Sequence, residues 1–169
     1  DNGETGAIGS FSKAGIYGET IIDVSKQFSS TIGLRYDDHS KYGPHNVYRT
    51  TFNYRYFEDL IYKASVGTGF RPPSVYELGN LATGVTTLNP EESTTLDMGI
   101  TKIFNKSNHI NAAVFKSTIS NRVDWTSGGY DNVTMIEKRQ GIEIGYSFKP
   151  IEDLKGIFSY TRTSDQNGN

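Results

Sequence analysis

Two short stretches of the sequence carry residue types that could do chemistry. Asp38-His39-Ser40 contains the three residue types of a hydrolytic triad, but they are chain neighbours, whereas a triad is assembled in space from separate segments. Gly67-Thr68-Gly69 has the composition of a phosphate-binding loop, but Pro72 and Pro73 follow it and no helical periodicity does. We therefore expect no nucleophilic or nucleotide site, and we expect Asp38-His39-Ser40 to lie in a solvated loop.

Composition excludes several further classes of site. His39, His45 and His109 do not have the spacing of metal ligands, and the absence of cysteine excludes disulfides and thiolate metal sites. The net charge of -2 offers no basic footprint for nucleic acid. We therefore expect no enzyme activity, no resident metal, no cofactor and no nucleic-acid partner.

The dominant signal is an alternation of apolar and polar side chains with a period of two, clearest in 28–37, 46–57 and 60–71. A strand places successive side chains on opposite faces. These stretches run to about ten or eleven residues, the length that a tilted strand needs to cross hydrocarbon, whereas strands of soluble sheets have about five or six. The mean hydropathy of -0.51 is compatible with this length, because a barrel strand needs only one apolar face. The pattern predicts an all-β protein, the antiparallel wall of a transmembrane β-barrel.

We predict about eight strands. Their expected ranges are 7–23, 28–37, 46–57, 60–71, 93–104, 108–125, 132–149 and 153–163. Short breaks at 24–27, 58–59, 105–107 and 149–153 alternate with longer breaks at 38–45, 72–92 and 126–131. Outer-membrane barrels have short periplasmic turns and longer extracellular loops, so the longer breaks are predicted to lie outside the cell, together with a final loop over 164–169.

The alternation also assigns the two faces of the wall. The side chains predicted to face lipid are Ile32, Leu34, Phe52, Tyr54, Tyr62, Ala64, Val66, Leu96, Met98, Ile100, Ile142, Ile144, Tyr146 and Phe158. The charged side chains predicted to face the lumen are Arg35, Arg49, Arg55, Lys63, Arg71, Asp97, Arg139 and Glu143. The 108–125 stretch is ambiguous, because Ala113, Phe115 and Ile119 make its second face almost as apolar as its first. Either a bulge or a contact on the lumen side would explain it.

Residues 62–98 carry a resemblance to a known family. Tyr62–Leu78, which contains Gly69-Phe70-Arg71-Pro72-Pro73, and Asn89–Ser93 resemble the strand-loop-strand signature of TonB-dependent outer-membrane receptors. Matching segments in the family's order are Gly33–Ser40, Val123–Trp125, Gln140–Glu143 and Tyr160–Thr163. The family's Asn-Pro-x-Leu-x-Pro-Glu segment is contracted here over Thr86–Glu91, so the shape of the long outer loop departs from the family pattern.

The resemblance implies a Gram-negative outer-membrane barrel of about 22 strands with an N-terminal plug. Residues 1–169 would then be a partial barrel domain, with the plug and the C-terminal strands outside it. It further implies a receptor that binds a scarce metal complex, such as a ferric siderophore, haem or cobalamin, and imports it to the periplasm. The implied partners are the metal-chelate ligand, outer-membrane lipid and the TonB–ExbB–ExbD complex, which would act through the plug.

On this interpretation the ligand-binding candidates lie at the extracellular mouth. They are Arg35, Asp37, Asp38, His39, Arg71, Tyr76, Glu77 and Asn80. Arg35 and Arg71 would attract an anionic chelate, and the 72–92 loop would close over it; the alternative is that the charged side chains only line a hydrated lumen. Two further functions remain open: a passive porin, and a soluble β-domain that acts as a binding module or adhesin.

Overall fold

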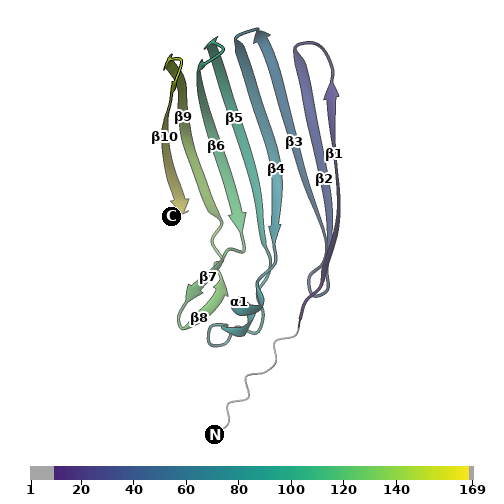
Figure 1. Cartoon of the computed structure of the whole chain (residues 1–169). Helices are drawn as coiled ribbons and strands as arrows, with labels where there is room; N and C mark the ends of the chain where they lie inside the picture. The colour runs from purple at the N-terminus through teal and green to yellow at the C-terminus, as the bar shows by residue number, and fades with distance from the viewer. Residues whose placement is uncertain (1–9, 168–169) are drawn as a thin grey trace.

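The protein folds as one curved antiparallel sheet with two structured loops at one end (Figure 1). The computed structural model describes residues 10–167. Eight strands pair in the order β1-β2-β3-β4-β5-β6-β9-β10, and the sheet is not closed. The strands of the sheet are β1 (Lys13–Asp23), β2 (Phe28–His39), β3 (Gly43–Phe57), β4 (Leu60–Arg71), β5 (Glu91–Asn105), β6 (Asn108–Ser120), β9 (Glu137–Ile151) and β10 (Leu154–Asn167). The loops contain α1 (Val75–Gly79) and the hairpin of β7 (Val123–Thr126) and β8 (Gly129–Asn132). The predicted all-β antiparallel wall is confirmed.

The shortest connections lie at one end of the sheet, and the two long ones lie at the other end. The turns at 24–27, 58–59, 106–107 and 152–153 lie at one end, and α1, β7 and β8 lie at the other (Figure 1). The predicted long break at 38–45 is wrong, because β2 continues to His39 and β3 restarts at Gly43, which pairs with His39. Gly43 has φ of 73°, a conformation that glycine adopts without strain, so a turn over 40–42 is sufficient. No helix among the described residues is both long and apolar enough to cross a membrane.

Several predicted strands have different ends in the structure. The first, predicted over 7–23, begins at Lys13, so its described residues 10–12 are not part of the strand. The 108–125 strand stops at Ser120, because Asn121 adopts φ of 55° and turns the chain out of the sheet. The next wall strand starts at Glu137 rather than at 132, and the intervening residues form the separate β7–β8 hairpin. Residues 164–167, predicted as loop, continue β10. Residues 7–9 of the first predicted strand and 168–169 of the last predicted loop lie outside the described range.

Away from the register shifts beside the short turns, the pairing places even-numbered wall residues on one face and odd-numbered ones on the other. One row across the sheet runs through Phe52, Ala64, Met98, Val114 and Ile142, each paired with the next. Every side chain predicted to face lipid is even-numbered and therefore lies on this single face. The apolar side chains are uncovered within this chain, as the 55% exposure of Met98 shows.

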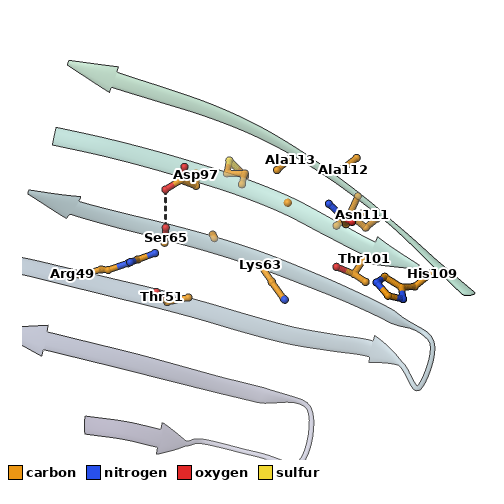
Figure 2. A pocket seen from close by; sticks show the side chains of 14 residues that line it. Arg49, Thr51, Lys63, Ser65, Asp97, Thr101, His109, Asn111, Ala112 and Ala113 are labelled. Atoms are coloured by element: carbon orange, nitrogen blue, oxygen red, sulfur yellow. Dashed lines mark hydrogen bonds between the residues drawn. The ribbon is translucent and has the colours of Figure 1, made fainter. Parts of the chain in front are cut away.

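The odd-numbered face is polar and hollowed. A cavity of about 530 Å³ lies over β3, β4, β5 and β6 and is lined by Arg49, Lys63, Asp97 and Asn111 among others (Figure 2). The Ser65 hydroxyl donates to Asp97 at 2.9 Å across this face. The charged side chains predicted to face the lumen are all odd-numbered and share this face.

The apolar residues on the second face of β6 are explained by a packing contact on the odd-numbered face, and not by a bulge. From His109 to Ile119 the register of β6 is unbroken against β9, so this stretch contains no bulge. Phe115 instead lies over Gly141 on the neighbouring strand, where a Cβ would come within 2.5 Å of the Phe115 Cζ atom. A glycine at this position makes room for the aromatic ring on the otherwise polar face.

We predict that Gly141→Ala destabilises the sheet by about 1–3 kcal/mol, the usual cost of overpacking. The added methyl group would meet Phe115 Cζ at 2.5 Å and the Arg162 carbonyl oxygen at 2.6 Å, and the carbonyl is backbone that cannot move without disturbing β10. The thermal unfolding midpoint, followed by circular dichroism, measures the effect. Gly18→Ala is the control, because a Cβ there meets nothing within 4 Å; equal shifts in the two variants would contradict the packing argument.

Candidate functional site

The two long connections fold together into one structured body, the loop unit, made of residues 72–90 and 121–136. Its interior contains Leu88, which is fully buried, and Ala82, which is 8% exposed. Among the described residues, these two and Pro73, which also belongs to the loop unit, are the buried apolar side chains. The small apolar core therefore lies in the loop unit rather than in the sheet.

A short capped helix forms the first part of the loop unit. Pro72 and Pro73 end β4, and Ser74 then caps α1: its hydroxyl accepts from the Glu77 backbone N–H at 3.2 Å, while the Glu77 carboxylate accepts from the Ser74 N–H at 2.6 Å. The Asn80 side chain donates to the Tyr76 carbonyl at 2.7 Å and closes the helix. Residues 75–79 are therefore helical, where the sequence was interpreted only as loop.

Arg71 joins the sheet to the loop unit. Its Nε and Nη2 atoms donate to the two carboxylate oxygens of Glu91, both at 2.7 Å, and its Nη1 donates to Glu77 at 3.1 Å. Arg71 and Glu91 face each other in the register of β4 and β5, so the bidentate pair closes the end of these strands. The charge of Arg71 is offset by two carboxylates, which fits a positioning role better than the predicted role of a free cation for an anionic ligand.

Two side chains tie the second loop to the first. The Asn132 amide accepts from the Asn89 N–H at 2.7 Å, and it donates to the Asn89 carbonyl at 3.0 Å and to the Asn121 carbonyl at 2.6 Å. Glu91 also accepts from the Val123 N–H at 2.8 Å. Asn132 therefore does for the irregular backbone of these loops what a neighbouring strand does in a sheet.

An exposed aromatic surface, made of Tyr76, Trp125 and Tyr130, lies on the loop unit. Tyr130 packs edge-on to Tyr76 at 6.0 Å and to Trp125 at 5.2 Å between ring centroids. Its backbone is held because its N–H donates to the Asn80 carbonyl at 2.7 Å. Tyr76 is 67% and Trp125 is 57% exposed, so both rings, one on α1 and the other opposite Tyr130 in the hairpin, are accessible from solvent.

The second group of predicted site residues lies at the end of β2. Asp37 is 3% exposed and lies 2.9 Å from the Arg35 Nε atom and 3.3 Å from Lys13 Nζ. His39 is 6% exposed, and its Nδ1 accepts from the Lys41 N–H at 3.2 Å. The prediction that Asp38-His39-Ser40 is a solvated loop is therefore wrong for His39, because strand pairing continues to this residue; Asp38 is exposed on β2.

Electrostatic interactions connect the turn that follows β2 with the helix α1 of the loop unit. Burial raises the pKa of Tyr42, in the 40–42 turn, and the negative charge of Glu77 raises this pKa further. Burial also acts to raise the pKa of Glu77, but the hydrogen bonds from Ser74 and Arg71 outweigh it and hold that pKa below its ordinary value. The turn and α1 therefore lie close enough to influence each other's charge.

Several residues of the site were missed in the sequence. Trp125 and Tyr130 lie in a hairpin whose turn, Ser127-Gly128, has a recognisable signal, with Gly128 at φ of 87°. The capping box of Ser74 and Glu77 also had a local signal, although Glu77 was predicted only as a ligand-binding candidate. Asn132 had none, because its partner Asn89 is 43 residues away in the chain.

We predict that Asn132→Ala loosens the second loop by roughly 2 kcal/mol, since it removes three hydrogen bonds worth about 1 kcal/mol each when partly exposed. The chain contains no cysteine, so a spin label on Ser127→Cys reports the hairpin alone. The label should gain mobility in the Asn132→Ala background. Asn53→Ala, on the sheet, should leave the spectrum unchanged; an immobile label in both variants would refute the tie between the loops.

We also predict that acid releases α1. Because the pKa of Glu77 is lowered in the folded protein, its ionised form stabilises the loop unit; this contribution is complete above the ordinary glutamate pKa of about 4.3 and is lost as the pH falls below it. A spin label on Val75→Cys should become mobile on acidification. Glu77→Gln should be mobile already at neutral pH, whereas Glu152→Gln, in a short turn, should keep the wild-type profile. A Glu77→Gln label as immobile as the wild type would contradict the role of the carboxylate.

Curated relatives match most of this chain but a small part of their own length. The vitamin B12 transporter BtuB of Vibrio cholerae serotype O1 is 24% identical over 125 residues, which cover 73% of this chain and 20% of the relative. The vitamin B12 transporter BtuB of Vibrio vulnificus is 29% identical over 136 residues, which cover 75% of this chain and 22% of the relative. The chain thus spans about a fifth of the length of these relatives.

Solved structures share the fold. The siderophore receptor PirA from Pseudomonas aeruginosa superposes with a TM-score of 0.81 at 22% identity, over 92% of this chain and 32% of that one. The copper transporter OprC superposes with a TM-score of 0.75 at 16% identity, over 93% of this chain and 28% of that one. At these identities the similarity establishes a common architecture.

The family assignment rests on the match to a family model. The model described as TonB dependent receptor-like, beta-barrel, matches residues 2–169. The resemblance seen in residues 62–98 is thereby confirmed over nearly the whole chain. The chain belongs to the TonB-dependent receptor family and forms part of its β-barrel domain.

Proposed function

We propose that this chain forms part of the wall and of the extracellular surface of a Gram-negative outer-membrane receptor that binds a scarce metal complex and imports it with energy supplied through TonB. The observation that carries the proposal is the family match over 2–169, joined to a structured loop unit with an exposed aromatic surface at one end of the sheet.

The two faces of the sheet support a position in a membrane. The even-numbered face presents apolar side chains such as Met98 and Ile100 in continuous rows, and a lipid bilayer is the environment in which such a face is stable. A strand that pairs on both sides leaves no backbone group unsatisfied in hydrocarbon. The short turns then belong to the periplasmic side, and the loop unit belongs outside the cell.

The names of the relatives support a metal complex as the cargo. Two matched relatives are named as vitamin B12 transporters, and the superposed structures are named as a siderophore receptor and a copper transporter. A ferric siderophore, haem or cobalamin carries flat or apolar groups that an aromatic surface can contact. We infer that Tyr76 and Asn80, together with Trp125 and Tyr130, form part of the contact surface.

The charged candidates fit supporting roles at the same mouth. Arg71 and Glu77 hold α1 in place through their mutual hydrogen bonds, and Arg35 and Asp37 form an ion pair at the end of β2. Asp38 and His39 complete this second part of the mouth. Energy from TonB–ExbB–ExbD would reach the barrel through the plug domain that is characteristic of the family, and the import cycle as a whole is part of the proposal.

We predict that cells producing the full-length receptor accumulate one of three radiolabelled probes, a ferric catecholate siderophore, haem or cobalamin, and that accumulation stops when TonB is deleted. Replacing both Tyr76 and Trp125 by alanine should weaken binding of that probe by about thirtyfold, since each aromatic contact contributes about 1 kcal/mol.

The control for this experiment is Tyr56→Ala, a half-exposed tyrosine near the short turns, which should bind the probe as the wild type does. Uptake that persists without TonB, accompanied by ion conductance of the purified protein, would replace this proposal by a passive porin. Recovery of the full-length protein in the aqueous phase after detergent extraction would support the soluble binding module instead.

A further inference from the structure

Four positively charged side chains of the strands lie on the mainly apolar even-numbered face. Lys102 on β5 lies beside the short turns and forms an ion pair with Asp59. The other three lie towards the opposite end of the sheet. They are Lys116 on β6, Lys138 on β9 and Arg162 on β10, three strands that lie side by side (Figure 1). All three side chains are exposed. A face turned to lipid does not favour charge unless an anion accompanies it, so their position needs an explanation.

The register gathers these three residues around Gln140. Gln140 lies directly opposite Lys116 on one side, and Lys138 is two residues away on its own strand. Arg162 pairs with Ile142 and is therefore the diagonal neighbour of Gln140 on the other side. Directly opposed side chains are about 5 Å apart and diagonal ones about 7–8 Å apart, so the four residues form one group, the cationic patch.

At the same end of the sheet, one cation on the opposite face has carboxylate partners. Arg139 on β9 forms ion pairs with Glu137 and, at 3.6 Å, with Asp165, and Arg122 of the loop unit lies 2.9 Å from the same Glu137. In the part of the chain that the structure describes, no carboxylate lies within 4.0 Å of Lys116, Lys138 or Arg162.

The carboxylate on β5 that shares the even-numbered face is Glu92, and the register places it opposite Ser120 rather than opposite a cation. Repulsion within the cationic patch is therefore not relieved by the chain itself. A partner that supplies negative charge would relieve it.

The height of the cationic patch indicates where this partner lies. On each strand the apolar rows end immediately below it, with Val114 before Lys116, Ile142 before Gln140 and Tyr160 before Arg162. The patch thus lies between the apolar band and the end of the sheet that carries the loop unit. With the orientation of the proposed function, on which this step rests, that level is the headgroup layer of the outer leaflet.

We propose that the cationic patch binds the phosphate groups of a phosphorylated lipid in the outer leaflet. The Arg162 guanidinium offers a planar pair of donors that matches phosphate geometry, the two lysines supply compact charges, and the Gln140 amide offers a further donor between them. The neighbouring hydrocarbon lowers the local dielectric constant and strengthens each of these contacts. Charge complementarity and continuity with the apolar band select a lipid as the occupant.

The test uses the full-length receptor that contains this chain, purified in a nonionic detergent. Binding of bisphosphorylated lipid A, and of the same lipid after enzymatic removal of its phosphates, is measured by native mass spectrometry. The wild-type receptor should prefer the phosphorylated lipid. The triple variant K116Q/K138Q/R162Q should bind it about 100-fold more weakly, since each cation near an anionic headgroup contributes roughly fivefold in affinity.

Two matched variants sharpen the test. K26Q/K106Q/K155Q removes the same charge from exposed lysines in and beside the short turns and should bind the phosphorylated lipid as the wild type does. Gln140→Glu is nearly isosteric and places a carboxylate among the three cations, so it should weaken phosphorylated-lipid binding while the protein still folds.

The proposal is overturned if the triple variant binds the phosphorylated lipid as tightly as the wild type, or if removing the phosphates leaves wild-type binding unchanged. Uptake of the metal complex is measured in the same cells. Retained uptake with lost lipid binding supports the patch. A wild-type receptor that binds the phosphorylated lipid but imports nothing would refute the proposed transport while supporting the patch.

Discussion

The rest of this structure depends on one constraint, antiparallel pairing in which even-numbered residues lie opposite even-numbered ones. Each hairpin of the sheet pairs even-numbered residues with even-numbered ones, so one row passes unbroken from Phe52 on β3 to Ile142 on β9. A slip of one residue in a single hairpin would move every following apolar side chain to the polar face. The three register shifts all lie beside the short turns, at Arg55/Phe57, Ile103/Asn105 and Leu154/Gly156, where they leave the central rows intact.

A wall built in this way cannot rely on a buried core of its own, and the loop unit has to be stabilised by other means. Leu88 and Ala82 give the loops a small apolar interior, and Asn132 satisfies backbone groups that no strand reaches. Arg71 connects the sheet to the loop unit, because its partner Glu91 begins β5 and its partner Glu77 lies on α1. The loops are therefore an extension of the sheet with defined geometry, and the aromatic surface on them is held in place by the protein itself.

The sequence was sufficient for the wall and insufficient for the loops, for a physical reason. Strands such as β4 and β5 repeat a period-two pattern over many residues, so each added residue strengthens the prediction of both the strand and its face. The turn over 40–42 and the end of β6 at Asn121 depend on single backbone conformations, which no pattern reports. The capped helix after Ser74 had a local signal, whereas the contact between Asn132 and Asn89 joins segments that are distant in sequence and required the fold to be known.

The same alternation explains why charged side chains are neutralised by different groups on the two faces of the sheet. An odd-numbered cation faces a hydrated interior, where the chain can supply a carboxylate from a neighbouring strand, as Glu137 does for Arg139. The even-numbered carboxylates of the wall strands, Asp38 and Glu92, lie at the end of the sheet that carries the loop unit, and none lies within the apolar rows, where desolvation would cost more than an ion pair returns. Lys102 finds its partner Asp59 in a short turn. At the level of the cationic patch, the proposed counter-charge is that of the lipid headgroups. On this argument Lys116, Lys138 and Arg162 remain without carboxylate partners in the described chain because the counter-charge belongs to the membrane.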